Sequence, residues 1–174
     1  DNFTYKVNDG NEDSAAAEVS ITVNPVDDAS VVSGDFNATM TEDETSVAGA
    51  IAIDDVDRDD NPEFVDATYI GAYGSLEVAN GSWTYTLVTD VQGLTNEDSL
   101  SEGFTLVASD GTDQTIGVVI NGLNDAPVVG DYAVTIAEDN QATGAVVGDD
   151  IDSNTLSYSL DSKNAPANGV AVVN

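Results

Sequence analysis

Apolar and polar residues alternate in short runs along most of the chain. Alternation over a handful of residues indicates strands with one buried face. No segment keeps the roughly 3.6-residue apolar period of an amphipathic helix for long. Short strands at this spacing predict an all-β protein built as a β-sandwich. The clearest strand signals are FTYKV (3–7), EVSITV (18–23), SWTYTLV (82–88), GFTLVA (103–108) and TIGVVI (115–120).

Turn-forming residues separate these runs. Asn8-Asp9-Gly10 and Asp110-Gly111 are two such clusters, and Asn80-Gly81 lies near the middle of SLEVANGSWTYTL. An Asn-Gly pair between alternating runs predicts a hairpin. One face of this hairpin would carry Trp83, Tyr85 and Leu87. We expect Trp83 to lie in the core, although a stacking face for a glycan, formed with Tyr69, Tyr73 and Tyr85, is the alternative.

The sequence also contains an internal repeat. VNPVDDASVV (23–32) matches INGLNDAPVV (120–129) at an offset of 97 residues. GDFNATMTED (34–43) matches GDYAVTIAED (130–139), and FTYKVNDG (3–10) matches FTLVASDG (104–111). A repeat of this length predicts tandem modules. We place a complete module at 30–126, preceded by the last strands of a module at 1–29 and followed by the first half of another at 127–174.

The two partial modules are complementary in kind, one a tail and one a head. Two interpretations follow. The chain is a fragment of a longer tandem array, or neighbouring copies complete each other's sandwiches by strand addition.

The charge of the chain narrows the choice of partners. With 33 acidic and three basic residues, the net charge is −30. Nucleic acid and anionic membranes are excluded as partners, because both attract basic surfaces. No apolar run is long enough for membrane insertion. Self-repulsion on this scale opposes the compact state, so a cation is expected to compensate. High salt is one candidate and a bound divalent metal is another.

The chain contains neither cysteine nor histidine. Disulfides, thiolate and imidazole catalysis and most zinc or copper sites are therefore excluded. Carboxylate, amide and hydroxyl oxygens remain, and the metal that they suit best is calcium. A glycosidase with paired carboxylates is conceivable, but the chain has one tryptophan and no large insertion to form a cleft. We expect no enzymatic activity.

The acidic residues cluster at corresponding places in the repeat. Glu-Asp ends the first strand of each module, Asp-Asp-x-Asp follows the second, and Asp-Gly follows the penultimate one. The spacing of Asp55, Asp57, Asp59 and Asn61 resembles an EF-hand loop, but Asp60 replaces its turn glycine. We interpret it as an aspartate-rich loop between strands. A surface adapted to high salt is the competing explanation.

The motifs NGLNDAPVV, GAVVGDDID and GSLEVANGSWTYTL, in this order and spacing, resemble the cadherin-like and VCBS-type repeats of giant bacterial repeats-in-toxin adhesins. The resemblance covers nearly the whole chain. It implies tandem immunoglobulin-like sandwiches of about seven strands, with calcium at the junctions between modules. The first linker has Ser30 where the second has Pro127, which predicts a looser first linker.

Carried over to this sequence, the resemblance implies two groups of metal ligands. The first junction would use Asp27, Asp28, Asp55, Asp57 and Asp110. The second would use Glu42, Asp43, Glu97, Asp98, Asn124, Asp125, Asp150 and Asp152.

The leading functional hypothesis is therefore a calcium-rigidified spacer in a long, secreted, extracellular adhesin. Its partners would be neighbouring modules of the same chain. The alternative is a subunit of a self-assembling filament or matrix, whose partners would be identical copies. A glycan-binding module is a third hypothesis.

Overall fold

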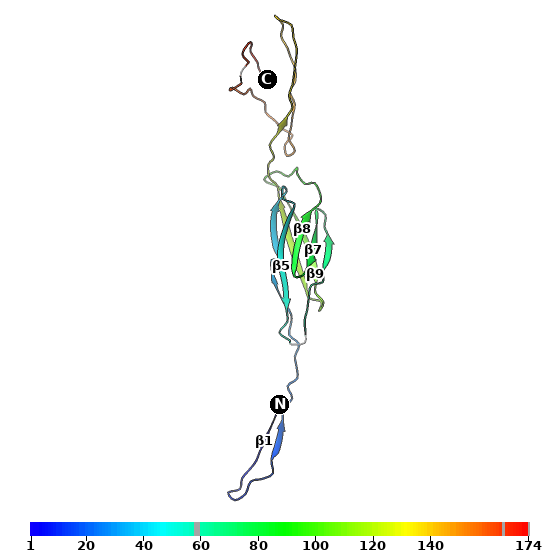
Figure 1. Cartoon of the computed structure of the whole chain (residues 1–174), viewed down its shortest axis with the longest axis vertical. Coiled ribbons are helices and arrows are strands. Elements are labelled where there is room, and N and C mark those ends of the chain that lie inside the picture. Colours follow the sequence, from blue (N-terminus) through cyan, green and yellow to red (C-terminus); the bar gives the residue numbers. More distant parts are fainter. Residues whose placement is uncertain (58–59, 165, 174) are drawn as a thin grey trace.

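The computed structural model describes residues 1–57, 60–164 and 166–173 of the chain. The molecule is long and narrow, with three parts in line (Figure 1). A hairpin lies at one end, a compact module lies in the middle, and an extended segment with little regular structure lies at the other end. All regular elements among the described residues are strands, which confirms the all-β prediction. No described helix is long and apolar enough to cross a membrane.

The central module consists of two sheets. In spatial order the five-stranded sheet contains β3 (Val31–Gly34), β5 (Ser46–Asp54), β8 (Ser82–Leu87), β7 (Gly74–Ala79) and β6 (Ala67–Ile70). The three-stranded sheet contains β4 (Asn37–Thr41), β10 (Asp113–Asn121) and β9 (Ser99–Val107). Neighbouring strands are antiparallel except β4 and β10, which are parallel.

The chain changes sheet between β3 and β4. Gly34 has a φ of 126°, a backbone conformation that favours glycine, and a Cβ there would clash with the backbone of Ala50. The Asp35 N–H then donates to the Ala50 carbonyl at 2.7 Å. The predicted first strand is therefore two strands. This switch lets the start of the module pair with β5 in one sheet and with β10 in the other.

The predicted hairpin is confirmed. β7 and β8 pair antiparallel, and Ala79 lies opposite Ser82, so Asn80 and Gly81 form a two-residue turn. Both turn residues have positive φ, 50° and 73°, as a type I′ turn requires.

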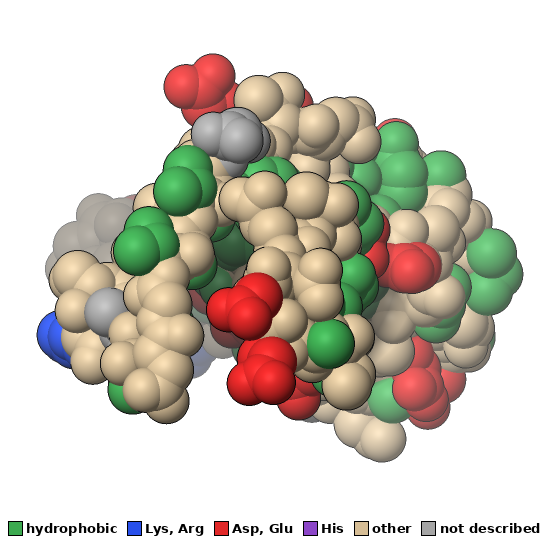
Figure 2. Space-filling view, turned by 90° about the horizontal axis from the view of Figure 1, so that it is seen from above, with side chains coloured by type: hydrophobic (Ala, Val, Ile, Leu, Met, Phe, Trp, Pro, Cys, Tyr) green, Lys and Arg blue, Asp and Glu red, His purple; other side chains and the backbone are tan. Residues whose placement is uncertain are grey.

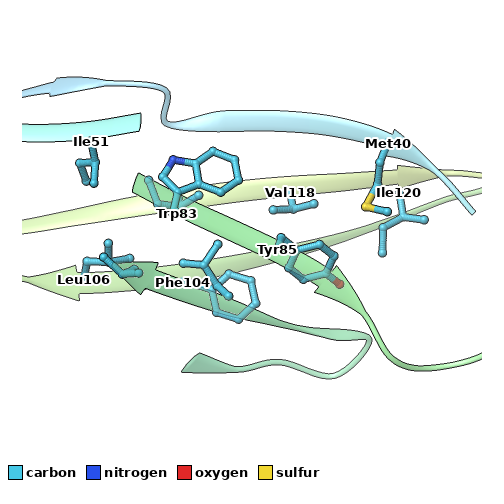
Figure 3. Packing of buried hydrophobic residues seen from close by; sticks show 11 residues of the cluster. Met40, Ile51, Trp83, Tyr85, Phe104, Leu106, Val118 and Ile120 are labelled. Carbon is cyan, nitrogen blue, oxygen red and sulfur yellow. The ribbon is translucent and has the colours of Figure 1, made fainter. Parts of the chain in front are cut away.

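The core lies between the two sheets (Figure 3). Trp83 and Tyr85 are 1% and 0% exposed, so the prediction that Trp83 is a core residue is confirmed. The Trp83 indole N–H donates to the Asp35 carbonyl at 2.8 Å, which satisfies its only donor. Tyr69 and Tyr73 are partly buried against the same core. The four aromatic side chains proposed for glycan stacking therefore pack against or within the core.

The two end parts bury few side chains. β1 (Asn2–Tyr5) and β2 (Ala17–Ser20) form an antiparallel hairpin in which Phe3 and Tyr5 are 54% and 50% exposed. Beyond the central module, β11 (Val128–Val129) pairs with β12 (Gly148–Asp149). Viewed along the long axis, Figure 2 shows hydrophobic side chains at the surface of the molecule.

Candidate metal sites at the two linkers

Acidic residues in the central module are concentrated in loops. Strands β3 to β10 contain four, namely Asp54, Glu77, Glu102 and Asp113. Asp54 and Asp113 are terminal residues of their strands. Glu102 accepts a hydrogen bond from the buried Tyr85 hydroxyl at 2.7 Å. The outer faces of both sheets are thus almost free of carboxylates.

The first linker brings acidic side chains together from two segments. Carboxylate oxygens of Asp27, Asp57 and Asp60 lie within 4.8 Å of one another. The Asp28 N–H donates to Asp57 Oδ2 at 2.7 Å, and the Asp57 N–H donates to Asp55 Oδ1 at 2.7 Å. Linker and loop are therefore joined by a backbone-to-carboxylate contact. Asp27, Asp28, Asp55, Asp60 and Asp110 line a hollow of about 510 Å³ beside it.

Ser30 lies between two more of these carboxylates. Its hydroxyl oxygen is 2.9 Å from Asp55 Oδ2 and 2.5 Å from Asp110 Oδ2. The hydrogen bond from Ser30, followed by that from the Thr112 N–H, lowers the pKa of Asp110 below its usual value. Ser30 thus lies against both loops, and its one hydroxyl proton can be donated to one of the two carboxylates at a time. The serine in place of proline predicted a looser first linker, and this hydrogen bond instead favours a first linker held to the module.

The second linker repeats the geometry of the first. The Asp125 N–H donates to Asp152 Oδ2 at 2.5 Å, and the Asp152 N–H donates to Asp150 Oδ1 at 3.0 Å. Asp125, Asp150 and Asp152 correspond in the repeat to Asp28, Asp55 and Asp57, which make the same two contacts. The internal repeat in the sequence is therefore also a repeat of linker geometry.

Negative charge accumulates at the second linker. Burial raises the pKa of Asp125, and the charges of Asp152, Asp43 and Asp150 raise it further. These carboxylates come from the module before the linker, from the linker, and from the segment after it. Asp152 Oδ1 is buried and has no hydrogen-bond partner among the described residues. A buried carboxylate oxygen without a donor is costly, and a bound cation is one partner that would satisfy it.

Glu42 lies at the same end of the module but faces inward. Its side chain is 3% exposed. Oε1 accepts the Leu123 N–H at 2.7 Å, and Oε2 accepts the Leu94 N–H at 3.2 Å. The carboxyl group thus has two backbone donors already, unlike the exposed Asp43 beside it.

The remaining expected ligands of the second junction are Asp98, Glu97 and Asn124. Asp98 accepts hydrogen bonds from the hydroxyl and the backbone N–H of Thr95, and these lower its pKa. Glu97 is exposed, and no hydrogen bond of its carboxylate is recorded in the described part of the chain. The Asn124 N–H donates to Asn96 Oδ1 at 2.7 Å. Asn96, which was not among the expected residues, therefore provides one of the contacts between this loop and the linker.

Asp60 is the other residue that sequence reasoning missed. The EF-hand-like spacing drew attention to alternate positions, whereas the Asp60 N–H donates to the Asp57 carbonyl at 3.1 Å. The carboxylate of Asp60 lies beside those of Asp27 and Asp57. Asp59, which belongs to the same spacing, lies outside the described residues.

The donor set at both linkers consists of carboxylate oxygens on loops. Calcium accepts six to eight such ligands in flexible geometry, whereas magnesium demands a strict octahedron. The unpartnered Asp152 oxygen and the raised pKa of Asp125 also fit a site that accepts a cation. No family model and no curated protein matches the chain.

Proposed function

We propose that the chain is a calcium-rigidified spacer of a long, secreted, extracellular adhesin, with Ca²⁺ bound at its two linkers. The observation that carries the proposal is the second linker, where Asp43, Asp125 and Asp152 converge from three consecutive parts of the chain. A cation there would be held only while these parts are aligned. Ligand binding to the aligned state alone stabilises that state by mass action. The carboxylates repel one another without metal, but together they would bind Ca²⁺, and the bound ion would hold the linker straight.

The fold supports the kind of module proposed, an immunoglobulin-like sandwich. Two facing sheets, a first strand that changes sheet, and a parallel pair between β4 and β10 are the supporting features. If β3 and β4 are counted as one strand, the central module has seven. The resemblance to cadherin-like and VCBS-type repeats of bacterial adhesins is part of this proposal.

The distribution of acids distinguishes the proposal from adaptation to high salt. A solvating coat would spread carboxylates over the sheet faces, yet those faces carry Glu77 and few others. Clusters at the linkers instead resemble ligand sets. The proposal therefore predicts a specific response to calcium.

Thermal unfolding in chelator, calcium, magnesium and sodium chloride tests this prediction. Calcium at about one hundred times its dissociation constant adds roughly 2.7 kcal/mol per site. For a domain of this size we expect the melting temperature to rise by roughly 10 °C or more. Magnesium at equal concentration should do much less. Equal stabilisation by sodium chloride and calcium would refute the proposal.

Single substitutions assign the sites. Asp57→Asn and Asp125→Asn should each weaken calcium binding, measured by titration calorimetry. Glu77→Gln is the matched control, because it removes one charge from an exposed strand position away from both linkers. Equal loss of affinity in all three variants would show that net charge, and not built sites, binds the metal.

Self-assembly by strand exchange is the second candidate, motivated by the exposed Phe3, Tyr5 and Tyr132. Light scattering after size exclusion in calcium checks this, and we expect a monomer.

Glycan binding and catalysis have less support. The aromatic side chains that would stack on a sugar pack against or within the core. The proposal therefore assigns the chain a structural role and no reaction.

A further inference from the structure

The start of the second linker is bound to the central module along four consecutive residues. The Asn121 carbonyl accepts the Glu42 N–H at 3.0 Å, and the Gly122 N–H donates to the Asp98 carbonyl at 3.0 Å. The Leu123 N–H donates to Glu42 Oε1, and the Asn124 N–H donates to Asn96 Oδ1. None of these contacts needs a metal ion.

Glu42 makes more of these contacts than any other residue involved. Its main chain bonds to Asn121 and accepts the Gln92 side-chain amide at 2.8 Å. Its carboxyl group joins the loop before β9, at Leu94, to the linker, at Leu123. Burial of such a group is tolerated only where hydrogen-bond donors surround it. Glu42 thus joins its own segment to two others, which lie 50 to 81 residues further along the chain.

Gly122 shows how closely the linker is packed. A Cβ at this position would clash with the Thr95 carbonyl and would lie 2.7 Å from Leu94 Cβ. Close approach of two backbones is a common reason for glycine. The linker therefore leaves the module in contact with the loop that precedes β9.

We propose that Glu42 is a positioning residue that fixes the direction in which the second linker leaves the central module, without a cation. Residues 121–124 then move with the module, and rotation between module and following segment is confined to the bonds that follow Asn124. The same anchoring holds the neighbouring Asp43 beside Asp125. Only a role of Asp43 as a metal ligand rests on the proposed calcium function. Glu42 thus acts through backbone amides, in contrast to the ligand role that its place in the sequence suggested.

Hydrogen–deuterium exchange of the full chain in excess chelator tests the inference. We expect the amides of Leu123 and Asn124 to be protected in the native chain, and Glu42→Ala, which removes both acceptor oxygens, to speed exchange at Leu123 by roughly tenfold or more. Amides of Ile116 and Val118 in β10 report whether the module stays folded. The matched control is Glu138→Ala, since Glu138 corresponds to Glu42 in the repeat but is exposed.

A second variant distinguishes the loss of a single contact from unfolding of the module. Asn96→Ala removes the acceptor of the Asn124 N–H from a loop and should release Asn124 while Leu123 stays protected. The inference is overturned if the native amides of Leu123 and Asn124 exchange freely in chelator and slow only with calcium, because the cation would then hold the linker. It is also overturned if Glu42→Ala leaves Leu123 protected. Failure of calcium to raise the melting temperature would refute the proposed function alone and leave this protection intact.

Discussion

At the scale of single residues, two aspartates at the linkers have opposite pKa shifts. Asp110 has its pKa lowered, first by the Ser30 hydroxyl and then by the Thr112 N–H. Asp125 has its pKa raised by burial and by Asp152 and other carboxylates. Hydrogen-bond donors favour the charged form, and like charges disfavour it. The contrast means that a cation would relieve repulsion at the second linker in particular.

The pKa of Asp125 should therefore respond to calcium. In chelator, a carboxyl-carbon NMR titration should give Asp125 a pKa above that of an ordinary aspartate. Because the folded pKa is raised, the folded state binds the proton more tightly than the unfolded chain does. The destabilising contribution of Asp125 is thus complete above this pKa and disappears as the pH falls through it. Saturating calcium should lower the pKa, and an unchanged titration in calcium would contradict a site at Asp125.

The neighbours of Asp125 were easier to predict from the sequence than the hydrogen-bond partners of Glu42. The repeat placed Asp125 with Asp150 and Asp152, because equivalent motifs occupy equivalent positions in repeated modules. Glu42 was expected as a ligand beside Asp43, since adjacent residues share a motif. Adjacent side chains at the end of a strand point in different directions, and which one faces inward depends on Leu94 and Leu123, far away in the chain.

At the scale of elements, the sequence pattern predicted those features that depend on residues close together in the chain. The β7–β8 hairpin follows from Asn80-Gly81 and from alternation, and its register confirms it. The division of the first strand into β3 and β4 could not be predicted in this way. It depends on the choice of β5 and β10 as partners, which lie elsewhere in the sequence. Gly34 was a possible local signal, because glycine tolerates the positive φ that the change of sheet requires.

Gly49 gives a prediction about packing within β5. Gly49 lies opposite Trp83, and a Cβ there would lie 2.5 Å from the indole Cζ2 atom. Gly49→Ala should therefore lower the free energy of unfolding by about 1–3 kcal/mol through overpacking. Urea unfolding followed by tryptophan fluorescence measures this, because Trp83 is the single tryptophan and reports the central module. Ala48→Ser, at the exposed neighbouring position, should change little, and a loss of similar size there would contradict the packing argument.

At the scale of the whole molecule, the nearly neutral sheet faces of the central module lie between two acidic linkers. The molecule is narrow (Figure 1), and electrostatic repulsion is concentrated at these two linkers. At both linkers the contacts between linker and loop involve carboxylates, at Asp57 and at Asp152. The extension of the molecule should consequently depend on what neutralises these two places.

Small-angle X-ray scattering measures this dependence. In calcium we expect the maximum dimension of an extended molecule, and in chelator a smaller average dimension with the signature of flexible linkers. Asp125→Asn together with Asp152→Asn should make the calcium profile resemble the chelator profile in part, because one linker is released while the other remains. Glu77→Gln should leave the calcium profile unchanged. Equal extension in chelator and in calcium would mean that protein contacts alone, such as those of Glu42 and Ser30, keep the molecule straight, and the metal would then have no structural role.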